Sequence, residues 1–493
     1  MTPDEPGPLS LLPIAATLIV ALLMRNVLLG LFVGVLVGAT MVVESSVLQF
    51  LPRTLSDFVV PQVADGYNAS VIVLLAFIGG FVKLIEFSGA GRAFAMAAAR
   101  RVAGRVGAQL GAWFGGIAIF FSDLGTPLIV GPVFQSLFER AGLSRQKLAF
   151  ILDSTSSPVA ILIPFIGWGV FIMSVLADAF ADNKLAASEW DAFVAAIPYQ
   201  LYAWLAIAVV PLVVWLRVDL GAMGRAESAA RQSAATASEA STVDQRARPS
   251  MVWLPLLVLG ASLFLTLGEL GFPFEPVPGS AFRAGLAAAY LLAAVTLTVL
   301  MLRHRLAPFA TVSATYVSGM AGMLPIAATL VLAWSLGALG EALGTGPYVA
   351  RIAGETIAAW GLPAMVFLLA GCISFATGSS WGTIVIMMPL AVPAALATDA
   401  AMAVVVGAVL SGGLFGDHAS PVSETTILSS TGAATPPMEH FVTQLPYALM
   451  NGALALGGFL AAGFFASPWA VLPLLLAQAG VVVALGRAWR RSG

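Results

Sequence analysis

The sequence is poor in charged residues. Only 10% of its 493 residues are Asp, Glu, Lys or Arg, whereas an ordinary soluble domain carries about 25%. Because a surface in water needs charge, this is too little to cover a soluble body of such a length. The formal net charge of −2 also gives no electrostatic basis for binding nucleic acid, so we expect no such partner.

Cysteine and histidine are scarce as well. Cys372 is the only cysteine, which excludes an internal disulfide and a thiolate metal cluster. The three histidines, His304, His418 and His440, are far apart and lack the spacing of metal ligands. A phosphate-binding G-x-x-x-x-G-K loop is absent. These absences argue against an enzyme and against a bound cofactor.

Apolar residues are abundant, at 59% of the chain. Runs such as Leu11–Met24, Val71–Phe81 and Leu472–Leu485 are almost wholly apolar, and about 20 such helical residues span a bilayer. The runs lack the strict alternation of barrel strands of ~10 residues, and lipid forces the backbone to hydrogen-bond within each segment. We therefore predict an all-α polytopic membrane protein. Asp4 and Glu5 stand where a signal peptide is basic, so the first run is expected to be retained.

Lys and Arg gather in clusters, such as Arg92–Arg105 and Arg140–Lys147, which mark the cytoplasmic side. Threading the chain through these clusters places the N-terminus outside and the C-terminus inside, with about 11 transmembrane helices. The stretches ~106–138 and 361–397 are predicted to be re-entrant hairpins, since basic clusters flank the first at both ends. The predicted crossings are 9–25, 28–44, 68–86, 147–177, 193–216, 251–268, 283–302, 322–340, 401–424, 441–465 and 468–487.

The two halves of the chain resemble each other. Glu86-Phe-Ser-Gly89 matches Glu341-Ala-Leu-Gly344, and Asp153-Ser-Thr-Ser-Ser-Pro158 matches Asp417-His-Ala-Ser-Pro421. In the threading the two repeats start from opposite sides of the membrane, which predicts two inverted repeats, as in many secondary transporters. The predicted units are N-terminal helices 1–67, the first repeat 68–216, a linker 217–250, connecting helices 251–321, the second repeat 322–466 and a C-terminal helix 467–493.

The predicted linker is rich in Ala, Ser, Gln and Arg. This composition is typical of a flexible cytoplasmic segment, and an ordered amphipathic helix is the alternative. As a flexible segment it would be dispensable, so deletion of Gly221–Val243 is expected to leave activity largely unaffected.

Each repeat contains places where a membrane helix should break, because Pro removes a backbone donor and Gly permits unusual dihedrals. A break at membrane depth frees carbonyl and amide groups beside hydroxyls and carboxylates, which are the oxygen ligands that a small cation needs. A charge at the bilayer centre costs at least ~2.5–3.5 kcal/mol, so acids there are usually functional. The candidate cation- and proton-binding residues are Asp123, Asp153, Ser154, Thr155, Ser157, Thr377, Ser379, Ser380, Thr383, Asp417, His418, Ser420, Ser423 and Glu424.

Asp153 and Asp417 are the expected sodium ligands. Competition of a proton and a cation for one carboxylate is the simplest physical basis for antiport. Each candidate also has a structural alternative: Asp153 and Asp417 could cap helices, His418 could bond within the core, and the hydroxyls could bond their own helices. Glu424 could be solvated at the cytoplasmic end.

Three segments resemble the NhaC-type sodium/proton antiporter family. They are Phe415-Gly-Asp-His-Ala-Ser-Pro-Val-Ser-Glu-Thr-Thr-Ile-Leu-Ser-Ser-Thr-Gly432, Lys147-Leu-Ala-Phe-Ile-Leu-Asp-Ser-Thr-Ser-Ser-Pro-Val-Ala-Ile-Leu-Ile-Pro164, and Ala376-Thr-Gly-Ser-Ser-Trp-Gly-Thr383. The resemblance implies inverted repeats with re-entrant hairpins, a mobile transport domain and the exchange of Na⁺ for H⁺. By motif it assigns Asp153, Asp417, His418, Ser420 and Ser423 to family positions.

The sequence departs from the family pattern in a few positions. Ala419 and Glu424 stand where the family usually has Cys and Asp, and the first hairpin tip, Ser122-Asp123-Leu-Gly-Thr, is less polar. Relatives also include exchangers of small organic acids and amino acids, so a cation-coupled exchanger of a small carboxylate or amino acid is the alternative. The resemblance alone points to a homodimer. We expect the protein in the cell membrane, which is the inner membrane if the source is a Gram-negative bacterium.

Overall fold

The computed structural model describes residues 7–24, 26–43, 46–91, 93, 104–123, 125–233, 247–270 and 279–492. Within these ranges the secondary structure is helical and contains no strand, as the sequence predicts. Most of the predicted basic cluster Arg92–Arg105, and residues 234–246 of the predicted linker, lie outside the described residues.

Seven of the described helical segments are long and apolar enough to cross a membrane: 66–88, 250–268, 281–303, 309–343, 380–398, 437–464 and 468–486. The bent pair 189–199 and 201–216, with an angle of 44°, makes an eighth if it is one span. Shorter apolar helices lie at 8–24, 27–42, 362–377 and 402–418. The chain is therefore a multi-pass membrane protein, and the count of 11 crossings stays a prediction.

The first repeat forms a helical hairpin followed by broken helices. Its elements are α5 (Gly66–Ser88), α7 (Gly104–Ala118), α8 (Gly125–Arg140), α9 (Arg145–Ser154), α10 (Ser157–Ala160), α11 (Gly167–Asp182), α12 (Glu189–Ala196), η3 (Ile197–Tyr199) and α13 (Leu201–Leu216). Helices α7 and α8 pack against each other as the predicted hairpin. The single span predicted at 147–177 is instead divided into α9, α10 and α11, because the Ser-Pro break interrupts it.

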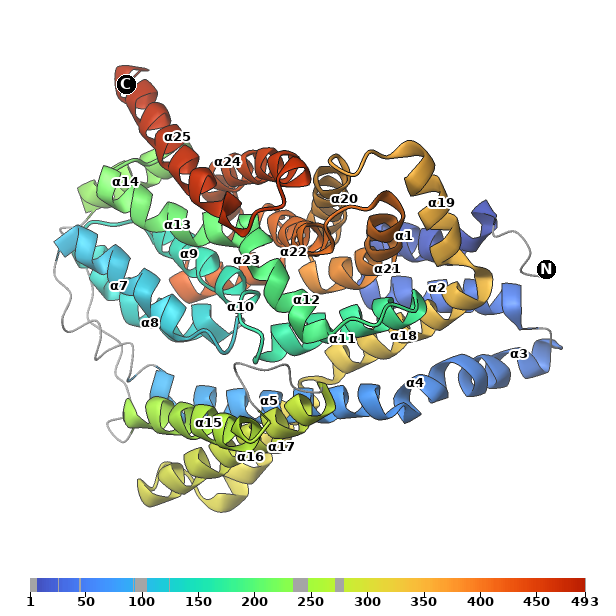
Figure 1. The fold of residues 1–493 in the computed structure, drawn as a ribbon. Coiled ribbons are helices and arrows are strands. Elements are labelled where there is room, and N and C mark those ends of the chain that lie inside the picture. Colours follow the sequence, from blue (N-terminus) through green and yellow to red (C-terminus); the bar gives the residue numbers. More distant parts are fainter. Residues whose placement is uncertain are drawn as a thin grey trace.

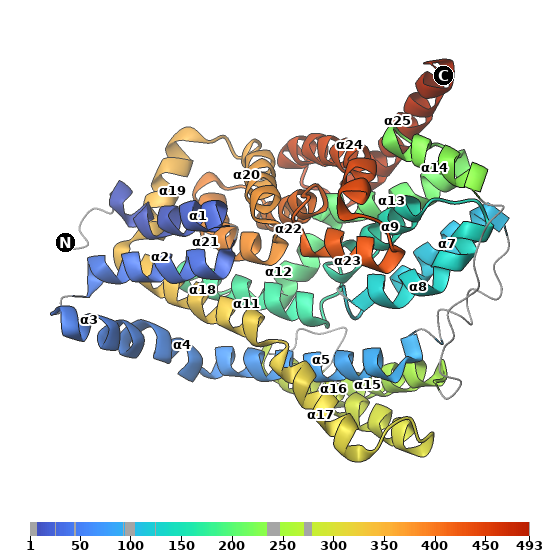
Figure 2. The same cartoon turned by 180° about the vertical axis from the view of Figure 1, so that it is seen from behind.

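The second repeat also has a helical hairpin followed by a helix that ends at a break. It comprises α18 (Leu324–Leu343), α19 (Thr345–Thr356), α20 (Leu362–Thr377), α21 (Ser380–Thr398), α22 (Met402–His418), α23 (Glu424–Ala433) and α24 (Pro437–Phe464). Helices α20 and α21 form its hairpin, and α22 is separated from α23 by a Ser-Pro break. α23 packs against α8 and α9 of the first repeat, which brings the two breaks together (Figure 2).

The matching Glu-x-x-Gly segments end equivalent helices. Gly89 ends α5 with φ +66°, and its amide donates to the Glu86 carbonyl. Gly344 ends α18 with φ +70°, and its amide donates to the Glu341 carbonyl. This left-handed conformation is one that glycine adopts at little cost, so the sequence match corresponds to a duplicated helix cap.

Two further groups of helices flank the repeats. α15 (Ser250–Gly268), α16 (Gly279–Arg303) and α17 (Phe309–Ala321) pack with α5 along one side of the molecule (Figure 1). α1 (Leu12–Met24) packs on α2 (Val27–Val42), which packs on α18. After η5 (Pro468–Ala470), α25 (Val471–Ser492) runs beside α13 and α24.

Several segments that we expected to be loops are helical. The outer loop expected after residue 44 contains α3 (Val47–Thr54), η2 (Leu55–Val59) and α4 (Val60–Ala64). The linker contains α14 (Ala222–Ser233), so the prediction of a flexible segment is wrong for these residues and the alternative helix is correct. The element η1 (Pro8–Leu11) precedes α1.

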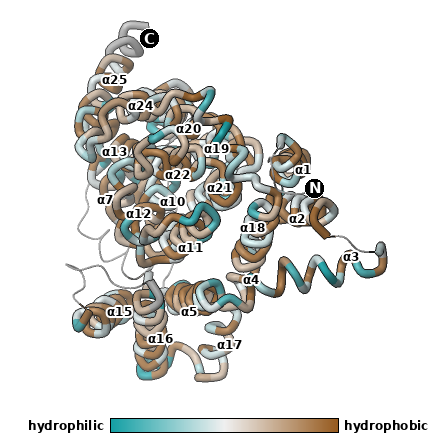
Figure 3. The backbone as a smooth tube through the Cα atoms, turned by 45° about the vertical axis from the view of Figure 1, so that its right-hand side comes forward, coloured by the Kyte–Doolittle hydropathy of each residue, from teal (hydrophilic) through white to brown (hydrophobic). Residues whose placement is uncertain are grey.

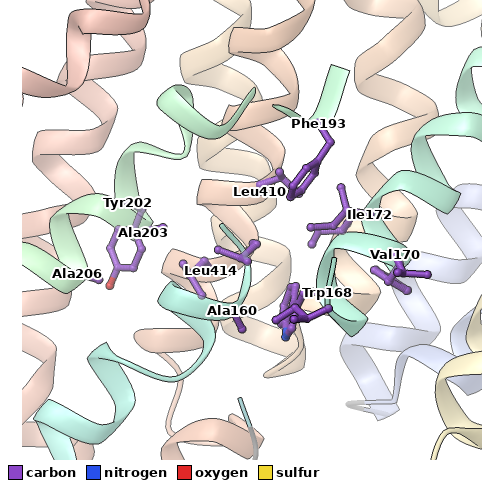
Figure 4. Packing of buried hydrophobic residues seen from close by; sticks show 14 of the residues in the cluster. Ala160, Trp168, Val170, Ile172, Phe193, Tyr202, Ala203, Ala206, Leu410 and Leu414 are labelled. Carbon is purple, nitrogen blue, oxygen red and sulfur yellow. The ribbon is translucent and has the colours of Figure 1, made fainter. Parts of the chain in front are cut away.

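Hydrophobic residues occur along most of the helices, as the colours of Figure 3 show, and large apolar side chains are found both buried and exposed. Leu23, Leu265, Phe465 and Leu476 are each at least 75% exposed, which fits a surface that faces lipid. Inside, Leu410 and Leu414 of α22 lie near Phe193, Trp168 and Tyr202 of the first repeat (Figure 4).

Candidate functional site

Asp153 lies in the last turn of α9 and is fully buried. Ser144 caps the start of this helix, and Thr155 ends it by donating its hydroxyl to the Ile151 carbonyl at 2.8 Å. Next to Thr155, Gly116 lets α7 approach the break, because a Cβ there would overlap the Thr155 hydroxyl. The carboxylate is therefore held at the point where the first repeat's helix is interrupted.

The partners of the Asp153 carboxylate come from the second repeat. The Gln444 amide donates to its Oδ2 at 2.6 Å, and His440 Nε2 lies 3.3 Å from the same oxygen. The Thr426 and Ser429 hydroxyls donate more weakly, at 3.5 and 3.4 Å. A buried carboxylate needs such partners, because an unpaired charge in this position would be very costly. Asp153 is thus part of a contact between the repeats, and not only a helix cap.

His418 and Gln444 connect the two breaks. His418 Nε2 lies 3.7 Å from Asp153 Oδ1, and its Nδ1 lies 3.2 Å from the Tyr202 hydroxyl. The Gln444 amide that bonds Asp153 also donates to the His418 carbonyl at 2.9 Å. One glutamine therefore ties the end of α9 to the end of α22.

Asp417 occupies the last turn of α22 and has a different environment. Its Oδ2 accepts hydrogen bonds from the Ser380 hydroxyl at 3.1 Å and from the Thr425 hydroxyl at 3.4 Å. The Ser423 hydroxyl lies 3.0 Å from that of Thr425 and also caps α23. Asp417 is 3% exposed. The hydrogen-bond donors to Asp417 are hydroxyl groups, whereas the partners of Asp153 include an amide and imidazoles.

The second hairpin tip contributes only some of its predicted hydroxyls to this cluster. Gly378, with φ +67°, turns the chain, and Ser379 caps α21. Thr377 and Thr383 donate to carbonyls of their own hairpin, so for these the structural alternative describes their contacts. Ser420 likewise donates to the Phe375 carbonyl at 2.8 Å.

The tip also has the G-x-S-x-G spacing of a hydrolase nucleophile elbow around Ser380. An elbow joins a strand to a helix, but this tip joins the two helices α20 and α21. The Ser380 hydroxyl donates to Asp417 and not to a histidine. The spacing therefore does not indicate an acyl-transfer site.

Asp123 and Glu424 lie at the margin of the site. Asp123 accepts a hydrogen bond from the Trp168 indole at 2.7 Å. The Trp168 ring packs on Trp381 of the second hairpin, with centroids 4.3 Å apart, so the two tips are joined through these rings. Glu424 opens α23 and is exposed.

The predicted hydroxyls next to Asp153 are buried. Ser154 and Ser157 have no hydrogen-bond partner among the described residues, whereas Thr155 bonds its own helix. A buried hydroxyl without a partner is costly. Their oxygens therefore keep lone pairs available beside the Asp153 break.

Sequence reasoning missed His440, Gln444, Thr425, Thr426 and Ser429. His440 and Gln444 are four residues apart on α24 and so share one helix face. That spacing of two polar residues within a membrane helix is the signal in the sequence that points to them.

A cavity of about 610 Å³ lies between α11, α18, α19 and α21. Asp182 and Glu341 line it together with Lys184, and its wall on α21 begins at Val385, five residues after Ser380. It does not include Asp153 or Asp417. The two buried carboxylates are therefore enclosed by packed helices, while an acid-lined cavity opens farther along the second hairpin.

Comparison with known proteins connects this arrangement to transporters. The model of the Na⁺/H⁺ antiporter family matches residues 159–464, a range that contains Asp417 and begins six residues after Asp153. An uncharacterized protein of Haemophilus influenzae is 30% identical over 473 residues, which cover 92% of this chain and 91% of that protein. An uncharacterized Na⁺/H⁺ antiporter of the same organism is 34% identical over 87 residues, or 17% of this chain and 19% of that protein.

Two solved structures share the fold. The YdaH transporter of Alcanivorax borkumensis aligns with a TM-score of 0.58 and 16% identity, over 94% of this chain and 99% of that one. MtrF of Neisseria gonorrhoeae, described within a class of antimetabolite efflux pumps, aligns with a TM-score of 0.57 and 14% identity, over 91% and 94% of the two chains. At such identities the likeness concerns the fold alone.

Proposed function

The chain belongs to the Na⁺/H⁺ antiporter family, and from this premise we propose that it exchanges Na⁺ for H⁺ across the cell membrane by alternating access. The observation that carries the proposal is the meeting of two buried carboxylates, Asp153 and Asp417, at duplicated helix breaks. We also propose that the chain is of the NhaC type within this family.

The oxygen atoms around Asp417 suit a small cation. Its carboxylate, with the hydroxyls of Ser380, Thr425 and Ser423, offers hard oxygen ligands of the kind that bind alkali and alkaline-earth ions. Hydroxyls can rotate, so they can donate to the carboxylate when no ion is bound and direct lone pairs to an ion when one arrives. Asp417 is the proposed sodium ligand with the better oxygen set.

In this proposal Asp153 carries the proton, and it lies close to the oxygen atoms around Asp417. Through Gln444 its carboxylate is connected to the backbone of His418, the residue after Asp417. A cation bound at one carboxylate changes the electrostatic potential at the other, because the two groups are close together. A proton and a cation then compete for one buried cluster, and each is carried only when the other has left.

Alternating access is supported by the duplicated breaks. Broken helices at an interface between repeats are a common basis for carrying an ion while closing the opposite side. Trp168 of α11 joins the two hairpins, because it donates to Asp123 at the first tip and packs on Trp381 of the second hairpin. In this proposal the two hairpins and broken helices move as the transport domain.

The proposal predicts that Asp153→Asn and Asp417→Asn each abolish exchange, because neither amide can carry the proton or balance the cation's charge. The measurement uses the purified protein in liposomes with a trapped pH dye, an imposed Na⁺ gradient, and K⁺ and choline controls. The matched control is Asp191→Asn, an exposed aspartate of α12, which should exchange like the wild type.

A sodium-dependent pH change that survives in either buried-site variant would remove that residue from the mechanism. If the wild type responds to no alkali cation, sodium/proton exchange is wrong. The alternative of a small carboxylate or amino-acid exchanger is then tested with malate, lactate and amino acids in the same vesicles.

A further inference from the structure

A second polar cavity, of about 460 Å³, has a lining that includes neither of the two aspartates. It is formed where the helix of the linker, α14, approaches the end of α13 and the start of α7. Its polar lining residues are Arg105, Gln109, Arg217, Asp219, Glu227 and Arg231. Three of the six are arginines, which is unusual in a chain with so few charges.

The two acids of this cavity already have cationic partners. Glu227 pairs with Arg105 at 2.6 Å, and Asp219 pairs with the buried Lys147 at 2.7 Å. Arg217 and Arg231 have no ion pair or hydrogen bond among the described residues. The positive charge of two guanidinium groups at one cavity is therefore not balanced by its lining.

The cavity is held in place by buried contacts of residues 217–233. The Glu227 carboxylate is 3% exposed and accepts a hydrogen bond from the Ser144 amide at 2.8 Å, at the start of α9. The Leu220 amide donates to the Tyr447 hydroxyl of α24 at 2.8 Å. These contacts hold the backbone that carries Arg217 and Arg231, and both arginine side chains are exposed to a ligand.

We propose that this cavity binds the phosphate group of an anionic ligand, held by Arg217 and Arg231. Guanidinium groups form paired, charge-assisted hydrogen bonds with phosphate oxygens. The ligand is the headgroup of an anionic phospholipid or a soluble phosphate compound, since both present the same chemistry. The positive-inside rule places this end of α13 at the cytoplasmic surface, which both sources reach.

The test measures binding to the purified full-length protein with two probes. Inorganic pyrophosphate is titrated by calorimetry, and binding to vesicles of phosphatidylcholine with or without phosphatidylglycerol is measured with the protein in neutral-lipid nanodiscs. We expect saturable binding of at least one probe by the wild type. The double variant Arg217→Gln/Arg231→Gln should weaken it by about tenfold or more, because both charge-assisted contacts are lost.

The matched control is Arg225→Gln, which removes an exposed arginine of the same helix that does not line the cavity. Its affinity should equal that of the wild type. Binding of pyrophosphate alone identifies a soluble phosphate ligand, and a response to phosphatidylglycerol alone identifies a lipid headgroup. Absence of binding of both probes, or equal weakening by Arg225→Gln, overturns the proposal, and neither result bears on sodium/proton exchange.

Discussion

At the scale of single residues, the two aspartates that look equivalent in the sequence have different environments. Asp153 contacts an amide and an imidazole at 2.6 and 3.3 Å, whereas Asp417 contacts hydroxyls. Hydrogen bonds from amide and imidazole groups fix the position of a carboxylate, while hydroxyls can turn their oxygens toward a cation. The internal repeat thus places two carboxylates, and the residues that differ between the repeats give them different hydrogen-bond partners.

Substitution of Gln444 should distinguish an effect on the position of the Asp153 carboxylate from an effect on the stability of the fold. Gln444→Leu keeps a similar volume but removes the amide from both Asp153 and the His418 carbonyl. Hydrogen bonds to charged groups are worth about 1.5–3 kcal/mol, so the exchange rate in liposomes should fall by about tenfold or more.

The control for this prediction is Gln478→Leu. Gln478 is also buried and donates to the Leu205 carbonyl and to Asn451, outside the proposed site. The Gln478→Leu variant should be less stable than the wild type, but the fraction that remains folded should exchange ions without a comparable loss of rate. An equal loss of exchange in both variants would mean that Gln444 acts through stability alone.

At the scale of elements, α14 is the main departure from the sequence prediction. A composition rich in Ala, Ser and Arg predicted flexibility, yet Glu227 is buried against α7 and α9. The buried Glu227 needs its partners Arg105 and the Ser144 amide, since an unpaired carboxylate in that place would be costly, and these contacts order α14 despite its composition. The expectation that residues 221–243 are dispensable does not follow from this geometry.

Docking of α14 predicts a measurable stability effect for Glu227→Gln. The change removes the charge partner of Arg105, and the half-buried Arg105 limits the loss of free energy of unfolding to about 1–3 kcal/mol. Chemical denaturation of the purified protein measures it. Ser228→Ala, at an exposed position of the same helix, should unfold like the wild type, and so would Glu227→Gln if α14 were not docked.

Glycines set the contact between the repeats at the element scale. A Cβ at Gly131 of α8 would overlap the Gly432 carbonyl of α23, so the two helices can cross this closely only without side chains. That crossing holds α23, with Thr426 and Ser429, against the end of α9.

At the scale of the whole molecule, an ion pair joins α16, one of the three helices α15 to α17 that flank the repeats, to the first repeat. Arg283 of α16 pairs with Glu189 of α12 at 3.1 Å, bonds the Ser70 hydroxyl at 2.8 Å and covers the Tyr67 ring at 3.6 Å. Arg283 is 9% exposed. This contact ties α16 to α5 and to α12, one of the helices that follow the first break.

Loss of the Arg283–Glu189 pair should lower the stability of the folded protein without changing the proposed ion site. Glu189→Gln leaves a mostly buried guanidinium without its carboxylate, which should lower the free energy of unfolding by about 1–3 kcal/mol. Thermal unfolding in detergent measures the change, and Asp191→Asn, two residues away and exposed, is the control. An unchanged midpoint would show that the two groups are held by apolar packing alone.

The sequence by itself determined the helical membrane architecture, both hairpins and the helix breaks. Scarce charge and long apolar runs leave few other structures in lipid, and Gly and Pro act locally, so their effect is visible without a fold. Asp153 and Asp417 were found for the same reason.

Only the tertiary structure decided which side chains surround these aspartates. Asp153 and Gln444 are 291 residues apart, and no local pattern pairs two such positions. The packing of α24, which carries Gln444, against α9 brings them together. Close packing of whole helices, and not the preference of any single residue, fixes contacts at that separation.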